Sequence, residues 1–323
     1  MPTDLPSGRV QPRFAGVATF MRAPLLSQVR PENQPADWAV YGVPFDGGTT
    51  YHPGARFGPR AIRDASQYIK PINFHAELDL ARELSIADAG DAIVAPYSCE
   101  GTLEAAVEFA SKLGDPARTR LLALGGDHSI ALANIRVAWE RAGRPATGLP
   151  LLHFDAHLDT ADTIWDEKYG HASFLRRGIE DGCIDPERTL SIGFRGPLNT
   201  MDDLEYATGK GIEVVPMTRW VEDRPSVDRA IHEWRASINQ DPVYVTFDID
   251  AIDPAFAPGT GTPCCGGFTT AEAFSILRKF EGMRLAGADV VEVCPSRDVS
   301  DITALAAAHV AFEILSIDAG AGG

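Results

Sequence analysis

Short apolar runs alternate with helix-forming segments along most of this chain, and this alternation restricts its possible folds more than any other feature. Eight runs are predicted to be strands, because several are nearly continuous in hydrophobic residues, as strands covered on both faces are. They are residues 38–43, 84–88, 120–124, 150–155, 189–194, 212–216, 243–248 and 285–293. Strands that alternate with helices predict a parallel sheet with helices on both faces.

The segments between these runs begin with residues that favour the start of a helix. The expected starts are Pro59 at a first helical position, Ser98 before 99–112, the capping-box pair Thr269 and Glu272 before 273–280, and Ser300 before 302–317. Residues 1–36 contain repeated prolines and are predicted to form an irregular N-terminal arm. Residues 37–323 show no internal repeat and no linker, so we predict that they form a single domain.

Composition excludes several classes of function. The chain of 323 residues has 29 basic and 45 acidic residues, and its net charge of −16 opposes binding to nucleic acid or to an anionic membrane. Its five cysteines are odd in number and lack CxxC spacing, which argues against a disulfide framework or a zinc ribbon. No apolar run approaches the ~20 residues of a membrane span, and the first residues lack a signal-peptide pattern. We therefore expect a cytoplasmic protein.

Asp155, His157 and Asp159 follow one of the apolar runs at alternate positions. In an extended backbone, residues i, i+2 and i+4 project from one side, so these side chains are expected to converge. Crowded carboxylates repel each other and take up protons unless a cation neutralises them. Ligands of open parallel sheets bind beyond the carboxyl ends of the strands. The segment therefore predicts part of a metal site, with a solvated loop as the alternative for this motif alone.

Matching side chains follow three other predicted strands: His128, the pair Asp248 and Asp250, and Glu292. The histidines and aspartates together supply six candidate metal ligands: His128, Asp155, His157, Asp159, Asp248 and Asp250. Six such ligands are too many for one ion. They suit two ions that lie ~3.5–4 Å apart and share bridging carboxylates. Nitrogen and oxygen ligands without thiolate suit manganese, cobalt, nickel, iron or zinc better than calcium or magnesium.

Three motifs stand in a fixed order: GGDHS at 125–129, DAHLD at 155–159 and TFDIDAIDPAFAPGTGTP at 246–263. This combination resembles the ureohydrolase family, which contains arginase, agmatinase and related amidinohydrolases. Segments 42–62 and 287–295 are similar to the agmatinase branch, so the resemblance runs almost the full length. It implies a ureohydrolase catalytic domain over 37–323 with the three-layer α/β/α arginase-like fold. The central sheet of that fold is mostly parallel and eight-stranded, as the count of runs also predicts.

The resemblance implies a site with two divalent metal ions, manganese as the first expectation and nickel as the alternative. One ion would be held by His128, Asp155, Asp159 and Asp248, and the other by Asp155, His157, Asp248 and Asp250. In this arrangement Asp155 and Asp248 bridge the two ions. The family also implies a homo-oligomer, a trimer or a hexamer, and a hetero-oligomer with a paralogue is an alternative.

The implied reaction is attack of a metal-bridging hydroxide on a guanidino compound, which releases urea or a urea derivative and an amine. Glu292 would bind and orient the guanidinium, Asp159 would hold the nucleophile, and His171 would pass a proton to the leaving amine. A structural pair is the alternative for Glu292, and a helix cap for His171. Agmatine, 4-guanidinobutanoate, 3-guanidinopropanoate, guanidine and a substituted biguanide remain open as substrates.

The sequence departs from the family pattern beside the predicted site. Leu158 stands where the family usually has a small hydroxyl residue, and His171 precedes Ala-Ser-Phe where agmatinase-like members usually read HGTPF. We expect Leu158 and Trp165 to contact the substrate, although alternation along the strand could turn Leu158 away. A catalytically silent subunit that supports an active paralogue is the alternative function. A single-zinc deacetylase is disfavoured because Asp159 and Asp250 complete a second set of ligands.

Overall fold

The computed structural model describes residues 3 and 5–320, and a sheet of eight strands lies at its centre. The strands are β1 (Trp38–Gly42), β4 (Ile86–Asp91), β5 (Arg120–Leu124), β6 (Leu149–Phe154), β7 (Ile184–Ile192), β8 (Glu213–Val215), β9 (Val243–Asp248) and β10 (Leu285–Val291). Their order across the sheet is β4-β1-β5-β10-β9-β6-β7-β8, and all neighbours are parallel. Each expected run overlaps one of these strands, so the predicted fold class is confirmed.

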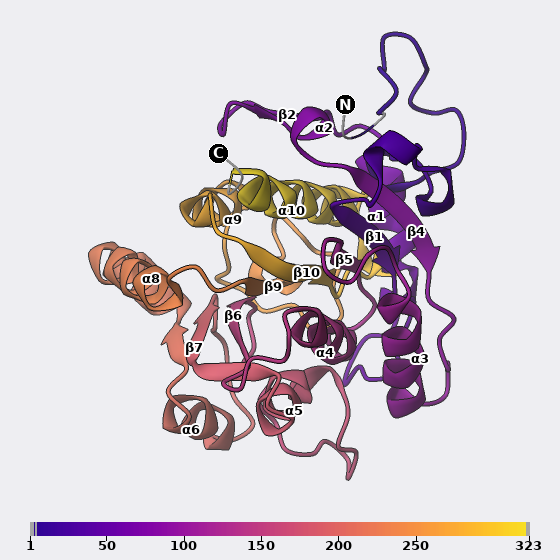
Figure 1. Cartoon of the computed structure of the whole chain (residues 1–323). Helices are drawn as coiled ribbons and strands as arrows, with labels where there is room; N and C mark the ends of the chain where they lie inside the picture. Colours follow the sequence, from indigo (N-terminus) through magenta and orange to yellow (C-terminus); the bar gives the residue numbers. More distant parts are fainter. Residues whose placement is uncertain (1–2, 4, 321–323) are drawn as a thin grey trace.

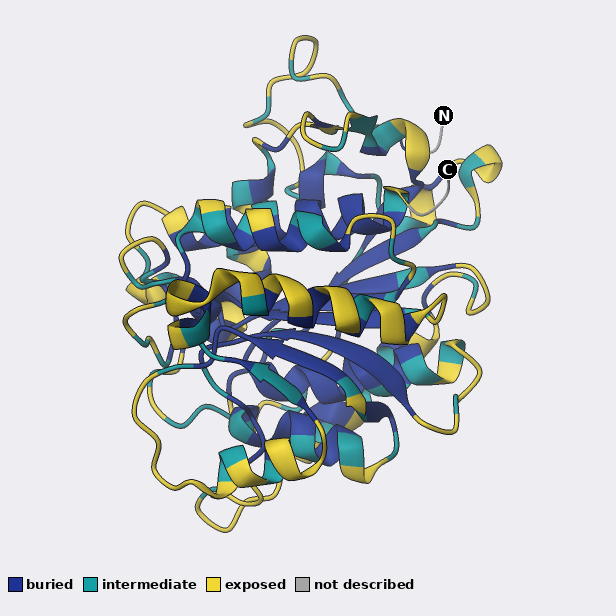
Figure 2. Cartoon of the chain, turned by 90° about the vertical axis from the view of Figure 1, so that its left-hand side faces the viewer, coloured by how far each residue is buried: buried dark blue, intermediate teal, exposed yellow. Residues whose placement is uncertain are grey.

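Helices cover both faces of the sheet and form the outer layers of a three-layer fold (Figure 1). One face carries α1 (Gly58–Ser66), α7 (Met217–Glu222), α8 (Arg224–Ile238), α9 (Thr270–Leu277) and α10 (Ile302–Ala319), and the other carries α3 (Cys99–Ser111), α4 (Ala131–Arg141), α5 (Phe174–Glu180) and α6 (Asp202–Gly209). In β5, Leu122 and Leu124 pack into one hydrophobic cluster and Leu121 and Ala123 into the other. Figure 2 shows the resulting buried sheet between helices whose outer sides are exposed.

Three of the four expected helix starts are present. Pro59 lies in the first turn of α1, the Ser98 side chain accepts a hydrogen bond from Gly101 N, and Thr269 forms a capping box with its partner at N3. The fourth helix, α10, begins at Ile302 as expected, but Ser300 does not cap it. The carboxylate of Asp298 instead accepts hydrogen bonds from the first amides of α10, at 3.0 Å.

The N-terminal arm carries only 3-10 turns within its described residues: η1 (Phe20–Arg22), η2 (Leu26–Gln28) and η3 (Pro31–Asn33). Its middle is nevertheless part of the core, because Phe20 is fully buried and its amide donates to Asp88 Oδ2 at 2.7 Å. Beside the arm lie α2 (Leu80–Glu83) and the small antiparallel hairpin of β2 (Ile72–Asn73) and β3 (Leu78–Asp79), which the sequence did not suggest (Figure 1).

By length and composition alone, helix α10 is long and apolar enough to cross a membrane, although its sequence includes the acidic residues Glu313 and Asp318. Within the fold 78% of this segment is buried, because α10 packs against the sheet and against α1 and α9. A helix that is hydrophobic on all sides is expected in the core of a large domain. Its burial here identifies α10 as such a core helix.

Candidate metal centre

The six predicted ligands lie at the carboxyl ends of three strands at the centre of the sheet, β5, β9 and β6, and Glu292 follows β10, which lies between β5 and β9. The loops approach closely at this edge, and a Cβ on Gly126 would lie 2.0 Å from the Phe45 carbonyl oxygen. Only glycine fits there without a shift of the backbone. Asp127 then ties the loop after β1 to the same edge, because its carboxylate accepts a hydrogen bond from Gly48 N at 2.7 Å. The carboxyl ends of β5, β9 and β6 thus bring the six predicted ligands together, and the end of β10 places Glu292 beside them.

His128 lies at the centre of the first group of ligands. Its Nδ1 lies 3.0 Å from Asp155 Oδ2, 3.0 Å from Asp159 Oδ2 and 3.2 Å from Asp248 Oδ2. This nitrogen is buried and makes no hydrogen bond of acceptable geometry among the described residues. A nitrogen and three carboxylate oxygens that surround one point without hydrogen bonding to each other form a donor set that fits a divalent cation.

His157 belongs to a second group next to the first. Its Nδ1 lies 3.1 Å from Asp250 Oδ2 and 3.2 Å from Asp155 Oδ1. Asp155 therefore directs one carboxylate oxygen to each group, as expected of a bridging ligand. Asp248 contacts His128 through Oδ2, while its Oδ1 accepts a hydrogen bond from Asp250 N at 2.8 Å. The structure brings the six residues together in two adjoining groups, and their role as metal ligands stays a prediction.

The electrostatics of the two groups also fit bound cations. Burial raises the pKa of Asp248 well above its usual range, and the charges of Asp250 and Asp155 raise it further. Burial and the charge of Asp155 likewise raise the pKa of Asp159. Burial alone would lower the pKa of His128, but the surrounding carboxylates raise it well above its usual range. Each shift shows that the cluster favours added positive charge, which protons or metal ions can supply.

Without bound cations, the protein is expected to become less stable as the pH rises above about 4, the ordinary pKa of aspartate, and further as it rises above about 6.5, that of histidine. The folded state holds protons on Asp248, Asp159 and His128 at pH values where the unfolded chain has released them, because all three pKa values are raised. A folded state that binds more protons loses stability as protons become scarce. The melting temperature of chelator-treated protein across this pH range measures the effect.

The metal-loaded protein in the same buffers is the control for this pH series. Bound cations replace the protons, so its melting temperature should fall less with pH than that of the chelated protein. Parallel curves for the two forms would show that the buried acid cluster is not the source of the pH dependence.

A buried chain of hydrogen bonds orients the His128 ring through its Nε2 atom, on the side away from the carboxylates around Nδ1. The hydroxyl of Tyr244 donates to Asp289 Oδ2 at 2.7 Å, and the hydroxyl of Thr246 donates to Asp289 Oδ1 at 2.5 Å. The single hydroxyl proton of Thr246 is thus used on Asp289, so Thr246 Oγ1 accepts from His128 Nε2 at 2.8 Å. This order places the His128 proton on Nε2 and leaves the Nδ1 lone pair free for a metal. The sequence did not single out Thr246 or Asp289.

Thr246→Val should weaken metal binding by roughly 10–100-fold, the usual effect of losing a partner behind a metal-binding histidine. Valine keeps the shape of threonine but cannot accept the hydrogen bond from His128 Nε2. Metal retention during dialysis against a graded chelator series measures the change. Thr246→Ser, which keeps the hydroxyl, is the matched control. Equal metal retention in the valine and serine variants would contradict this orienting role.

His153 was given no ligand role from the sequence, yet it contacts the shared carboxylate. Its Nε2 lies 3.1 Å from Asp155 Oδ2 and its Nδ1 lies 3.1 Å from Ser191 Oγ. Burial would raise the pKa of Asp155, but His128, His153 and His157 together hold it well below its usual range. The period of two along β6 places His153 and Asp155 on one side, and this signal could have identified the contact.

Glu292 and His171 form a pair beside the metal groups. Glu292 Oε1 accepts hydrogen bonds from His128 N and His171 Nδ1, both at 2.9 Å. Glu292 Oε2 is buried and has no hydrogen-bond partner among the described residues. Gly261 lies beside this oxygen, where a Cβ would come within 3.5 Å of it and within 2.8 Å of the His52 carbonyl oxygen. One carboxylate oxygen therefore holds the site together, and the other can accept a further donor.

The His171 ring has partners for either protonation state. Its Nε2 accepts from Thr50 N at 3.0 Å when the ring is neutral, and lies 2.8 Å from Thr50 Oγ1, which can accept from a protonated ring. Burial alone would lower the pKa of His171, but Glu292 and then Asp159 raise it to about 9. The Ala-Ser-Phe sequence that follows forms a 3-10 turn, η6 (His171–Ser173), leading into α5.

The two residues expected to contact substrate lie in different surroundings. Leu158 is 3% exposed and packs in a hydrophobic cluster with residues of α4 and α5, so it faces the core. This placement does not support contact between Leu158 and a substrate. Trp165 is exposed and lines a cavity of about 390 Å³ that Thr50, Glu100 and Glu167 also line. Because Thr50 also contacts His171, this cavity adjoins the site.

Comparisons with known proteins cover nearly the whole chain. A sequence model described as the Arginase family matches residues 36–316. Guanidinopropionase of Pseudomonas aeruginosa is 41% identical over 309 residues, which cover 95% of this chain and 93% of that protein. Guanidinobutyrase of the same organism is 38% identical over 312 residues, with 96% and 95% covered. The structure of proclavaminate amidino hydrolase from Streptomyces clavuligerus has a TM-score of 0.87 at 37% identity, and covers 96% of this chain and 100% of that one.

Proposed function

Because this chain belongs to the arginase family, we propose that it hydrolyses a guanidino compound and releases urea, or a urea derivative, together with an amine. One observation carries this proposal. Two adjoining groups of histidine and aspartate share Asp155, and beside them Glu292 presents a buried carboxylate oxygen that has no partner among the described residues. This arrangement offers both a place for two cations and a buried anion for a guanidinium.

The metal ions are proposed to be held by His128, Asp155, His157, Asp159, Asp248 and Asp250. Two divalent cations bound there would supply the Lewis acidity that makes water a nucleophile near neutral pH. The protein provides no thiolate in this set, and its nitrogen and oxygen donors suit both manganese and nickel. We propose manganese first, because of the family, and nickel as the alternative. Thr246 and His153 keep the donor atoms of His128 and Asp155 oriented.

Glu292 is proposed to bind the guanidinium. Its free Oε2 can accept an N–H from the positively charged group, and a charge-assisted hydrogen bond of this kind is strong in a buried site. The contact would also satisfy an oxygen that is otherwise buried without a partner. Because Oε1 is held by His128 N and His171 Nδ1, the carboxylate is fixed before substrate binds. Glu292 therefore orients the central carbon of the substrate toward the metal groups.

His171 is proposed to protonate the leaving amine. A pKa raised to about 9 keeps both ring nitrogens of His171 protonated at neutral pH. The Nε2–H then donates a hydrogen bond to Thr50 Oγ1 until the proton passes to the leaving amine. After transfer, the neutral ring retains its bond to Glu292 through Nδ1 and accepts from Thr50 N through Nε2. Asp159 lies within the first metal group, where we propose that it holds the nucleophile.

The cavity lined by Trp165 supports a substrate whose tail is neutral or cationic. Its lining includes Glu100, Glu167 and the aromatic residues Tyr97, Trp165 and Tyr169, and contains no lysine or arginine. Aromatic faces and carboxylates attract cations. We therefore propose that this chain prefers agmatine, a guanidino compound with an uncharged tail, or a biguanide over guanidino acids. By their names, the guanidinopropionase and guanidinobutyrase described above act on such acids.

The test is a urea-release screen over these guanidino compounds, with protein loaded separately with manganese and nickel. Agmatine and 4-guanidinobutanoate form the informative pair, because their chains have similar length and their ends have opposite charge. The expected result is a higher kcat/KM for agmatine, reduced by Glu167→Gln. A preference for 4-guanidinobutanoate would overturn the proposal for the tail but not for the reaction. No urea from any compound with either metal would favour a supporting subunit of a hetero-oligomer.

Compartment and assembly belong to the proposal as well. All five cysteines are free, which supports a reducing, cytoplasmic location. We propose a homo-oligomer, a trimer or hexamer, and sedimentation of the purified, metal-loaded protein distinguishes these states from a monomer.

A further inference from the structure

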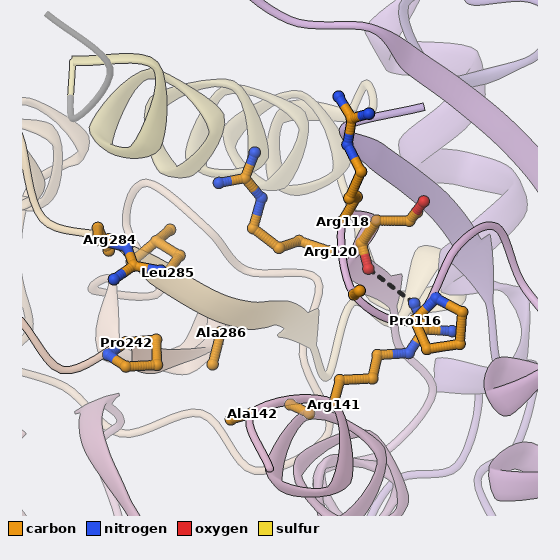
Figure 3. A pocket seen from close by; sticks show the side chains of 12 residues that line it. Pro116, Arg118, Arg120, Arg141, Ala142, Pro242, Arg284, Leu285 and Ala286 are labelled. Atoms are coloured by element: carbon orange, nitrogen blue, oxygen red, sulfur yellow. Dashed lines mark hydrogen bonds between the residues drawn. The ribbon is translucent and has the colours of Figure 1, made fainter. Parts of the chain in front are cut away.

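Figure 3 shows a second cavity, of about 280 Å³. It lies at the amino ends of β5 and β10, whereas the predicted metal ligands lie at the carboxyl ends of the strands. Its walls are the starts of β5 and β10, the residue before β9 and the end of α4. Four arginines line it: Arg118, Arg120, Arg141 and Arg284. None of its lining residues is acidic. This is a concentration of positive charge in a chain whose net charge is −16.

In the part of the chain that the structure describes, only one of these arginines is paired with a carboxylate. Arg120 Nη1 lies 2.7 Å from Asp318 Oδ2. The Nη atoms of Arg141 donate to three backbone carbonyl oxygens, at 2.7 to 2.8 Å, which orient the guanidinium but carry no net charge. Arg118 and Arg284 are exposed, and their side chains make no hydrogen bond or ion pair among the described residues. Three guanidinium charges around the cavity therefore have no paired carboxylate within residues 3 and 5–320.

Two buried donors in the same cavity wall also lack partners. The Nε atoms of Arg120 and Arg141 are buried and make no hydrogen bond within the described chain. Buried N–H groups without acceptors are costly, and charged donors more so. Burial also lowers the pKa of Arg141, as expected for a guanidinium that is removed from water without a close counter-ion. Each observation indicates that the cavity favours an added anion.

Apart from Thr119, the side chains that line the cavity between the arginines are apolar. Pro116, Pro242, Ala142, Leu285 and Ala286 line the cavity between the arginines (Figure 3). An apolar surface bordered by guanidinium groups suits a small organic anion, because the body of the ligand can pack on the apolar side chains while its oxygens meet the arginines. Guanidinium groups bind carboxylate and phosphate oxygens with two parallel hydrogen bonds.

We propose that this cavity is a binding site for the oxyanion group of a small molecule, separate from the metal centre. The shared chemistry is that of a tetrahedral phosphate-type group or a carboxylate. Arg118 and Arg284 are the residues that close on the ligand, while Arg120 and Arg141 are already fixed by their bonds to Asp318 and to the backbone.

The test is calorimetric titration of the metal-loaded protein with sodium sulfate in one arm and sodium succinate in the other. Saturable binding is expected, and the stronger of the two arms distinguishes a phosphate-type group from a carboxylate. The double variant Arg118→Ala, Arg284→Ala should weaken it by at least ~10-fold, because two charged hydrogen-bonding groups are lost. The matched control, Arg82→Ala with Arg229→Ala, removes the same charge from exposed positions elsewhere and should bind like the parent protein.

A further variant separates a built site from general attraction to positive charge. Arg118→Lys with Arg284→Lys keeps the charge but removes the paired donors, so binding should again weaken. Unchanged affinity in this variant, or in the alanine variant, would overturn the proposal, as would the absence of saturable binding in both arms. If the double variants do not fold, Arg284→Ala alone should still reduce affinity, and circular dichroism establishes that it is folded.

Discussion

Asp155→Ala is expected to abolish urea release and to deplete bound metal. Asp155 Oδ2 contacts the first group of ligands through His128, and Oδ1 contacts the second through His157, so one substitution removes a donor from both. Loss of a partner behind a metal ligand already costs about 10–100-fold in affinity or activity. Loss of a shared ligand should therefore lower metal affinity by more than ~100-fold. Elemental analysis after gel filtration and a urea assay at saturating substrate measure the two effects.

Asp228→Ala is the matched control for this substitution. Asp228 is an acid on α8 whose partly exposed carboxylate lies 3.0 Å from Lys279 Nζ, far from the predicted ligands in the sequence. It should retain full metal content and activity, because such surface pairs contribute little. Turnover and metal content in Asp155→Ala equal to those of Asp228→Ala would refute the shared-ligand assignment.

Glu292→Gln is expected to lower kcat/KM by about 10²–10³-fold, the usual effect of losing one preorganised charge-stabilising group. Glutamine can still accept hydrogen bonds from His128 N and His171 Nδ1, so the local structure should persist. The amide group that replaces Oε2 or Oε1 removes the negative charge that a guanidinium requires. A higher KM together with a lower kcat should therefore appear while metal content stays constant.

Metal content decides how this result is interpreted. Loss of metal in Glu292→Gln would make Glu292 a ligand instead of a guanidinium-binding residue. His171→Asn provides a comparison, because it removes the proposed proton donor but leaves Glu292 charged. It should lower kcat more than it raises KM. An equal rise of KM in both variants would show that the pair acts only as a unit in substrate binding.

Local sequence patterns predicted helices and strands well where neighbouring residues alone set the backbone conformation. Ser98 and Thr269 cap the helices that they precede, and each apolar run became a parallel strand. The predicted cap of α10 was wrong although its first residue, Ile302, was predicted correctly, because the carboxylate of Asp298 accepts hydrogen bonds from Thr303 N and Ala304 N. A capping contact of this length depends on the path of the loop, which neighbouring residues do not specify.

The sequence by itself predicted which six side chains gather at one edge of the sheet, and the structure brings those six together. The parallel sheet places its strand ends at one edge, so residues that follow different strands meet there. The expected strand alternation does not extend to Asp159, because β6 ends at Phe154 and Asp159 has a positive φ of 54°; the turn after β6 brings its carboxylate to the site. The tertiary structure decided what surrounds them. Thr246 and Asp289 act on His128 only because β9 and β10 are neighbours, and the packing of α4 and α5 buries Leu158 away from the site. Such contacts depend on strand order and helix packing, which join residues distant in the chain and leave no local periodic signal.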